Sequence, residues 1–201
     1  MATRKHNFNT KHYFLILLLI AAMAFVLTAC GGDAEDSDSG DADEDAYSYE
    51  VENIDNGTAL GTFNSVDLGG NEVSDAIFAE KDVTILNVWG TYCGPCIREM
   101  PELAALDSQL PDNAQVIGMV IDVPEGDRDM IKTAKQICAD NHVAYTNIAS
   151  NDSIEELLSS VEAIPTTFIL DSSGKTVCKP IVGADVDAYR EAALEYLQQF
   201  E

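Results

Sequence analysis

Short apolar runs alternate with amphipathic stretches along residues 56–201 of the chain. The run VTILNVW at 83–89 is rich in branched side chains, as expected of a central strand covered on both faces. Stretches with apolar residues at helical spacing follow such runs. The pattern predicts a β-hairpin at 63–74, strands at 83–89, 115–122, 144–148, 166–170 and 175–182, and helices at 97–110, 127–141, 153–161 and 185–200.

The order of these elements decides the fold class. A buried strand followed by a helix and then by another buried strand is typical of parallel β-α-β units with right-handed crossovers. The tight turn at 171–174 joins the last two strands and adds antiparallel pairing at one edge. We therefore expect an α/β fold with a mixed central sheet that is covered by helices on both faces.

The beginning of the chain has the composition of a targeting segment. Arg4, Lys5 and Lys11 make it positive, and 13–27 is an uninterrupted apolar run of 15 residues. A membrane-spanning helix needs about 20 apolar residues. In addition, no Lys or Arg follows the run before Lys81. The segment therefore predicts a signal peptide rather than a membrane-spanning helix.

The apolar run ends in Leu27-Thr28-Ala29-Cys30, which resembles the lipobox of bacterial lipoproteins. In that family the peptide is cut before the cysteine, whose sulfur then carries a diacylglyceryl group. The resemblance implies that residues 1–29 are removed. Acylated Cys30 would then hold the protein on the extracytoplasmic face of the bacterial cell membrane, since several acyl chains anchor stably. An ordinary cleavage site beside an incidental cysteine is the alternative.

Residues 30–55 predict a flexible tether. From 31 to 55 there are eleven acidic residues and no basic ones, and such a segment cannot bury enough apolar surface to become ordered. A calcium-binding tract is the alternative, although no EF-hand spacing is visible. Residues 56–201 remain as one domain, with eight basic and 24 acidic residues. The net charge of −24 for the whole chain argues against binding to nucleic acid, which requires a basic surface.

The motif CGPC at 93–96 lies between the strand predicted at 83–89 and a predicted helix. A cysteine at a helix start faces backbone N–H groups and the positive end of the helix dipole, which favour its thiolate. Cys93 is therefore predicted to attack a disulfide, and Cys96 to resolve the mixed disulfide. We expect no metal or cofactor, because zinc needs further ligands and haem attachment needs a His where Ile97 stands. A purely structural bridge would not favour Gly-Pro at a helix start.

The stretch WGTYCGPCIREMPEL at 89–103 resembles the thioredoxin superfamily, and specifically its membrane-anchored TlpA/ResA-type branch. The resemblance covers 60–201. It implies a thioredoxin-like fold in which 123–150 contains an inserted helix–strand segment. Pro101 matches the proline that kinks the active-site helix in that superfamily.

Ile164-Pro165-Thr166 is similar to the Ile-cis-Pro-Thr segment of the same superfamily. The resemblance implies that these three residues face the cysteines and offer backbone groups to a bound substrate chain. It also implies that Trp89 shields the disulfide. An ordinary trans proline in a loop and a tryptophan of the core are the alternatives.

Glu99 is the residue proposed to assist the resolving thiol. Thioredoxin carries a buried Asp six residues before its first cysteine, but here Asn87 stands at that position and cannot accept a proton. Glu99 lies three residues beyond Cys96 on the same helical face, and the TlpA/ResA branch often has an acid there. The resemblance implies a carboxylate with a raised pKa that moves a proton. A solvated carboxylate in the first helical turn is the alternative.

Cys138 and Cys178 are the two remaining cysteines. Outside the cytoplasm an unpaired thiol is unusual, so we expect a structural disulfide between them. Bonding needs Cα atoms within about 7 Å, and two separate buried thiols or a second redox pair are the alternatives.

Together these features predict a lipid-anchored extracytoplasmic thiol–disulfide oxidoreductase. Gly-Pro is the dipeptide of thioredoxin, whose potential of about −270 mV favours a disulfide reductase. The resemblance implies protein disulfide substrates, in cytochrome c maturation or among other extracytoplasmic proteins such as a methionine sulfoxide reductase. It also implies a CcdA/DsbD-type membrane electron donor. A thiol oxidase, a thiol peroxidase and a non-catalytic thioredoxin-like binding lipoprotein are the alternatives.

Overall fold

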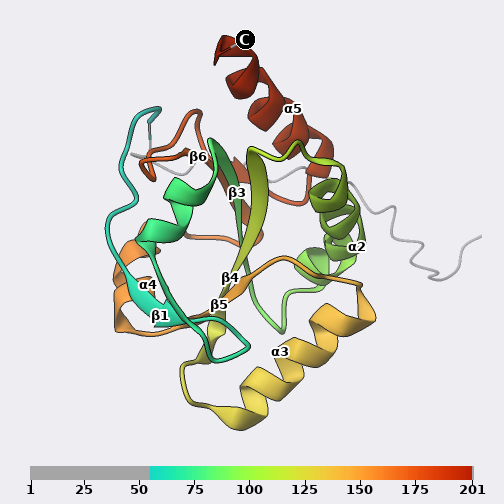
Figure 1. Ribbon diagram of the computed structural model, residues 1–201. Helices are drawn as coiled ribbons and strands as arrows, with labels where there is room; N and C mark the ends of the chain where they lie inside the picture. Colours follow the sequence, from blue (N-terminus) through green and yellow to red (C-terminus); the bar gives the residue numbers. More distant parts are fainter. Residues whose placement is uncertain (1–54, 201) are drawn as a thin grey trace, which may run out of the picture. The chain divides into compact units, whose positions relative to one another are not determined.

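The computed structural model describes residues 55–200 of the chain (Figure 1). The predicted signal peptide at 1–29 and Cys30 lie outside the described residues, as does the predicted tether at 30–55 except for its last residue. Among residues 55–200, no helix is both long enough and apolar enough to cross a membrane.

A five-stranded sheet forms the centre of the fold. Its strands are β3 (Val83–Trp89), β4 (Ala114–Pro124), β5 (Asn147–Ser150), β6 (Thr166–Asp171) and β7 (Ile181–Val182). They are hydrogen-bonded in the order β5-β4-β3-β6-β7. β4 is parallel to β3 and to β5, whereas β6 is antiparallel to β3 and to β7. The predicted mixed sheet is confirmed, and all seven residues of β3 are buried.

Helices cover both faces of this sheet. Successive residues of a strand point to opposite sides, and the buried side chains of β3 therefore pack against helices on each side. One face carries α2 (Gly94–Gln109), α3 (Arg128–Asp140) and α5 (Val186–Leu197), and the other carries η1 (Asp75–Glu80) and α4 (Asp152–Leu157). Ile85 of β3 packs with Leu103 and Tyr189 on the first face. Leu86 packs with Phe78 on the second face. Figure 1 shows α2 and α3 to the right of the sheet and α4 to its left. A short turn, η2 (Gln198–Phe200), follows α5.

α3 and β5 are the inserted helix–strand segment that the resemblance implies. Two right-handed crossovers in the same direction, β3-α2-β4 and β4-α3-β5, place α2 and α3 on the same face of the sheet. α4 then leads back across the opposite face to β6. The insertion therefore adds a parallel strand beside β4, at one edge of the sheet.

The predicted hairpin is confirmed as a separate two-stranded antiparallel sheet of β1 (Asn64–Val66) and β2 (Glu72–Ser74). Gly70 lies in its turn with a φ of +90°, a conformation that glycine adopts without strain. The hairpin is joined to β5 by an isolated bridge between Asp67 and Ile148.

The strand at the β7 edge and the helix before β6 are shorter than predicted. The strand expected at 175–182 is reduced to β7, because Pro180 has no N–H to donate and only isolated bridges form before it. The helix expected at 153–161 is the shorter α4. Ser159 and Ser160 lie beyond its end, and serine side chains compete for the backbone hydrogen bonds of a helix.

Gly118 of β4 is required by a close approach to Asn147. The Oδ1 of Asn147 accepts a hydrogen bond from the Nε1 of Trp89 at 2.9 Å. A Cβ at position 118 would overlap that oxygen and lie 2.7 Å from Asn147 Cγ. We expect Gly118→Ala to leave the buried indole N–H without its acceptor and to lower the free energy of unfolding by about 2–4 kcal/mol, measured in urea.

Asn147→Ala is the matched control for this prediction. The overlap needs the Asn147 side chain, so the double variant should be about as stable as Asn147→Ala alone. Costs that simply add in the double variant would contradict the explanation.

Candidate active site

The two cysteines of the CGPC motif lie where β3 gives way to α2. Cys93 is the N-cap of α2 and is joined to Cys96 by a disulfide, with the two Cα atoms 5.3 Å apart. The Sγ of Cys93 accepts a hydrogen bond from the backbone N–H of Cys96 at 3.2 Å. This N–H and the positive end of the helix dipole favour negative charge on the same sulfur when the disulfide is reduced.

The two cysteines differ in their exposure to solvent. Cys93 keeps 6% of its surface exposed, whereas Cys96 has 0%. An incoming sulfur therefore has access to Cys93 and not to Cys96. This geometry is the one that the predicted roles of attacking and resolving cysteine require.

Asp122 near the end of β4 holds the loop that carries the chain from β3 to Cys93. The backbone N–H of Thr91 donates to Asp122 Oδ1 at 2.9 Å, and the Thr91 hydroxyl donates to Oδ2 at 2.5 Å. Tyr92, the next residue, is 71% exposed. The sequence analysis misses both Asp122 and Tyr92. The position of an aromatic residue beside Cys93 is a signal for Tyr92, whereas nothing near Asp122 marks its contact.

The Pro165 segment lies against the disulfide. The peptide bond between Ile164 and Pro165 is cis, and the carbonyl oxygen of Ile164 lies 3.6 Å from the Sγ of Cys93. A disulfide sulfur has no hydrogen to donate, so this contact becomes a hydrogen bond only when Cys93 carries a proton. The structure thus brings the backbone of Ile164 to Cys93, as the resemblance implies, and the alternative of a trans proline is wrong.

Two of the residues predicted to belong to the substrate site, Trp89 and Thr166, are fully buried. Trp89 is 0% exposed and packs in the same cluster as both cysteines, so it covers the disulfide from the inside. Thr166 is also 0% exposed, and its hydroxyl donates to the carbonyl of Ala163 at 2.8 Å. Neither Trp89 nor Thr166 has exposed surface in the oxidised form, and contact of either residue with a bound chain stays a prediction. Pro165 is buried as well, while Ile164 is partly exposed.

Glu99 is a buried carboxyl group. It is 4% exposed and lies one turn beyond Cys96 on α2. The Nδ2 of Asn87 donates to its Oε1 at 2.9 Å, and the hydroxyl of Tyr189 lies 3.1 Å from its Oε2. The alternative of a solvated carboxylate is therefore wrong, and Asn87 is a donor to the carboxyl group.

Burial raises the pKa of Glu99 from 4.5 to about 7, because the ionised form loses its hydration. The hydrogen bonds from Asn87 and Tyr189 oppose this rise, and the charge of Glu102 adds to it. Both the protonated and the ionised form are therefore populated near neutral pH. A group that takes up and returns a proton needs such a pKa.

Cys138 and Cys178 are both free thiols, so the expected structural disulfide is not formed. Cys138 lies on α3 in a cluster with Val120 of β4, and Cys178 follows β6 and packs in the cluster of α5. β3 lies between β4 and β6, so the two cysteines belong to parts of the fold on either side of the central strand. Two separate thiols describe the structure, and burial raises the pKa of Cys138 to about 11.

The raised pKa of Glu99 gives a pH dependence of stability. The folded protein holds the proton up to about pH 7, whereas the unfolded chain releases it near 4.5. The free energy of unfolding should therefore fall as the pH rises through this window, by up to roughly 3 kcal/mol. Denaturation of the oxidised protein across the window measures this fall. Glu99→Gln cannot ionise and should lack the fall, and equal slopes in both proteins would contradict the raised pKa.

Comparison with known proteins gives the family. The Redoxin family model matches residues 55–196. Thiol-disulfide oxidoreductase ResA of Bacillus thuringiensis subsp. konkukian is 29% identical over 155 residues, which are 76% of this chain and 83% of the relative. A thiol:disulfide interchange protein DsbE homolog of Paracoccus denitrificans is 27% identical over 121 residues, which are 58% of this chain and 62% of the relative.

A solved structure has the same fold. The thioredoxin domain of a thiol-disulfide oxidoreductase from Bacteroides vulgatus gives a TM-score of 0.57 at 20% identity, covering 73% of this chain and 98% of that domain. The family match, these relatives and the Cys93–Cys96 disulfide agree with one another. The chain therefore belongs to the Redoxin family, and within the thioredoxin superfamily it is a thiol–disulfide oxidoreductase of the ResA and DsbE type.

Proposed function

We propose that this oxidoreductase works mainly as a reductase of protein disulfides, with Cys93 as the attacking thiolate and Cys96 as the resolving thiol. The Cys93 thiolate attacks one sulfur of a client disulfide, forms a mixed disulfide and releases the other client sulfur as a thiolate. The Cys96 thiolate then attacks the Sγ of Cys93. This step restores the Cys93–Cys96 disulfide and releases the second client thiolate, so that two electrons pass to the client.

One observation carries this proposal. The sulfur at the start of α2 both accepts the backbone N–H of Cys96 and belongs to the more exposed cysteine of the pair. The sulfur that a client reaches is thus the sulfur whose thiolate the helix favours. Exchange of the two roles would require a client sulfur to reach fully buried Cys96.

Glu99 is proposed to accept the proton that Cys96 loses before it attacks. Cys96 has no exposed surface, so solvent cannot take this proton directly. Glu99 is the buried carboxyl group one helical turn away, and its pKa of about 7 leaves a substantial ionised fraction at neutral pH. The same group returns the proton when an electron donor reduces the disulfide.

A client chain is proposed to bind over Ile164 and Tyr92. Gly90 lies between these side chains, because a Cβ there would be 3.1 Å from Ile164 Cδ1 and 3.2 Å from Tyr92 Cε1. Glycine at this position lets Ile164 and Tyr92 lie close together, and Tyr92 offers a largely exposed ring for apolar contact. An extended client segment can hydrogen-bond to the backbone of Ile164 in the manner of an added strand. Buried Pro165 restricts the conformation of that backbone.

The location and the partners are proposed from the sequence. Removal of residues 1–29 and acylation of Cys30 place the domain outside the cytoplasm, on the tether at 30–55. A dithiol there must receive its electrons across the membrane, which favours a CcdA/DsbD-type carrier as the donor. The proposed clients are disulfides of apocytochrome c in cytochrome c maturation, or disulfides of other extracytoplasmic proteins such as a methionine sulfoxide reductase.

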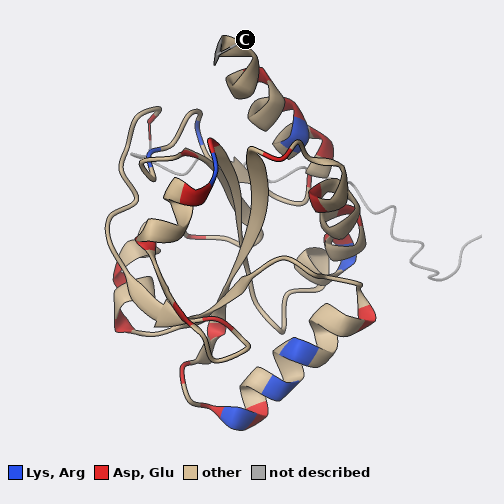
Figure 2. Cartoon of the chain, viewed as in Figure 1, with Lys and Arg blue, Asp and Glu red and all other residues tan. Residues whose placement is uncertain are grey.

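The charge of the domain narrows the choice of client. Figure 2 marks acidic positions on several helices and loops, whereas α3 carries a group of basic residues, Arg128, Lys132 and Lys135. Eight basic and 24 acidic residues give 56–201 a net charge of −16. Like charges slow encounter and suppress the wrong partners. The proposal is therefore that clients are neutral or basic around their disulfide.

Trapping of the mixed disulfide tests the proposal. In Cys96→Ser the second exchange cannot occur, so clients should accumulate on Cys93 and be identified by mass spectrometry after non-reducing electrophoresis. Cys93→Ser makes the same change of one atom and should trap nothing. If Cys96→Ser traps no client and loss of Cys93 leaves disulfide reduction unchanged, a non-catalytic binding lipoprotein is the better description.

The reduction potential of the Cys93–Cys96 pair tests whether the protein reduces or oxidises its clients. Equilibration with dithiothreitol buffers should give a value close to that of thioredoxin, about −270 mV, because the same Gly-Pro dipeptide separates the cysteines. A value near that of strong oxidants, about −120 mV, would favour a thiol oxidase or a thiol peroxidase instead.

A further inference from the structure

The buried hydroxyl of Tyr189 on α5 meets four polar groups, one of which is the side chain of Thr167 on β6. The backbone N–H of Asp185 donates to it at 3.1 Å, the carbonyl oxygen of Gly183 lies 2.5 Å away, and Glu99 Oε2 lies 3.1 Å away. A phenol has one proton to donate. Tyr189 therefore cannot donate to Gly183 and to Glu99 at the same time.

The protonation of Glu99 decides where the phenol proton points. The shorter contact assigns this proton to the carbonyl of Gly183. Protonated Glu99 can then donate its own O–H to the phenol oxygen, so that Gly183 and Glu99 both keep a partner. Ionised Glu99 has no proton to give and is a stronger acceptor than a neutral carbonyl. The phenol proton then turns to Glu99, and Gly183 loses its donor.

Gly183 connects this hydroxyl to the Pro165 segment. Its backbone N–H donates to the carbonyl oxygen of Pro165 at 2.8 Å. The preceding carbonyl, that of Ile164, is the one that faces Cys93. Gly183 has a φ of +95°, so a residue with a side chain would be strained at this junction. An unbroken series of contacts thus leads from the sulfur of Cys93 to the buried carboxyl group.

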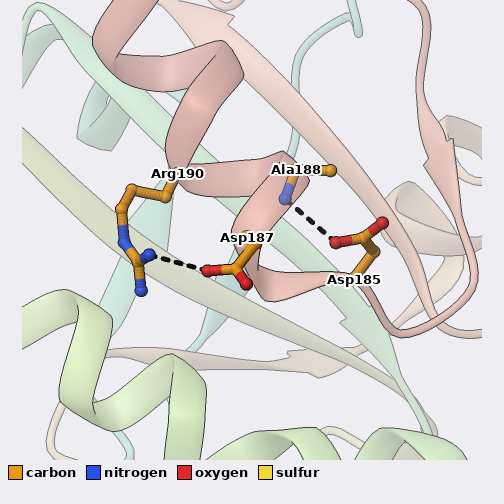
Figure 3. Close-up of polar contacts among 4 residues, drawn as sticks. All are labelled: Asp185, Asp187, Ala188 and Arg190. Atoms are coloured by element: carbon orange, nitrogen blue, oxygen red, sulfur yellow. Dashed lines mark hydrogen bonds and ion pairs between the residues drawn. The ribbon is translucent and has the colours of Figure 1, made fainter. Parts of the chain in front are cut away.

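The beginning of α5 holds Tyr189 in position. Figure 3 shows the side chain of Asp185 accepting the backbone N–H of Ala188, at 3.0 Å. The carbonyl of Asp185 accepts the backbone N–H of Tyr189 itself at 3.2 Å. The ion pair between Arg190 and Asp187 in the same view is largely exposed. The ring is thus fixed at its base, while the direction of its hydroxyl proton is free to change.

We propose that Tyr189 is a positioning residue that links a client chain bound at Ile164 and Pro165 to the proton on Glu99. A client that orders the Pro165 segment orders Gly183 as the acceptor of the phenol proton, and ionised Glu99 then loses a donor. Client binding therefore makes Glu99 a stronger base while the mixed disulfide awaits its proton transfer. By linkage, proton uptake on Glu99 strengthens the hydrogen bond from Tyr189 to the carbonyl of Gly183. This inference rests on the client site and the proton role proposed above.

Few charged groups compete for control of Glu99 within residues 55–200. The side chains that interact with it are Asn87, Tyr189, Glu102 and Tyr145. Burial raises the pKa of both tyrosines, so they stay protonated at neutral pH. Glu102 on the same helix is the one carboxylate of this group, and it is exposed. The donor that client binding can remove is therefore Tyr189.

The test measures the protonation of Glu99 directly. The C=O stretch of its protonated carboxyl group is followed by infrared spectroscopy against pH, and is assigned by its absence in Glu99→Gln. The full chain with Cys96→Ser carries one of two groups on Cys93, either a neutral peptide with a single cysteine or an S-methyl group. The peptide should raise the protonation midpoint above that of the S-methyl protein by about half a pH unit or more.

Tyr189→Phe keeps the ring and removes the hydroxyl. In this background the difference between the peptide and S-methyl proteins should shrink to less than half, because Gly183 and Glu99 no longer share a proton. Asp187→Asn, on the same helical turn and exposed, is the matched control and should leave the full difference. An equal difference with Tyr189 and with Tyr189→Phe, or no difference in either, would overturn the proposal.

Replacement of Tyr189 by 3-fluorotyrosine serves if Tyr189→Phe does not fold. Fluorine makes the phenol a stronger hydrogen-bond donor, so the protonation midpoint of Glu99 should fall in both the peptide and the S-methyl protein. A protonation midpoint that does not move would overturn the proposal. The proton role of Glu99 is examined separately, by the rate at which Cys96 resolves the peptide mixed disulfide in Glu99→Gln. An unchanged rate of resolution in Glu99→Gln would reject the proton role of Glu99. The difference in the protonation midpoint of Glu99 between the peptide and S-methyl proteins needs no turnover, so it still tests the link through Tyr189.

Discussion

The alignment of the first turn of α2 with the sulfur of Cys93 is the interaction on which the rest of the site depends. It exists because β3, buried along its whole length, delivers the chain to the end of the sheet, where Gly94 and Pro95 begin a helix at once. In an acidic domain, these backbone N–H groups supply positive potential that favours a thiolate. Asp122 fixes the approach to this helix through Thr91, and the carbonyl of Ile164 closes the other side of the sulfur.

Burial of Glu99 lowers stability at neutral pH, and three elements converge to hold it nonetheless. Asn87 comes from β3, Tyr189 from α5, and Glu99 itself from α2. Perturbed carboxyl groups of this kind concentrate at functional sites. The proposed function divides the chemistry between two environments. The sulfur proposed to meet clients is the more exposed one of the pair, while the proton proposed to accompany the second exchange is held on a buried carboxyl group.

Sequence patterns predict the features of this fold that depend on neighbouring residues. The apolar run of β3 and the CGPC motif after it predicted a strand, a turn and a helix, and hence which cysteine is exposed. Residues whose role depends on distant packing were harder to assign. Burial of Trp89 and Thr166 depends on what covers them, and pairing of Cys138 with Cys178 depends on the width of the sheet between them. Glu99 was left between two alternatives for the same reason. The contact of Tyr189 with Glu99 joins positions 90 residues apart, which no local pattern indicates.

The two edge strands of the sheet, β5 and β7, affect how copies of the protein behave when they are close together. An open edge strand is a template on which another copy can add itself, and an inserted parallel strand such as β5 would create one. Here the hairpin lies along it: Leu68 donates its N–H to the carbonyl of Asn147, and the hydroxyl of Ser65 donates to that of Ala149, each at 2.8 Å. On the far side, β7 has two residues and follows a proline. Both margins of the described sheet are therefore blunted, which protects densely packed copies from strand-by-strand aggregation.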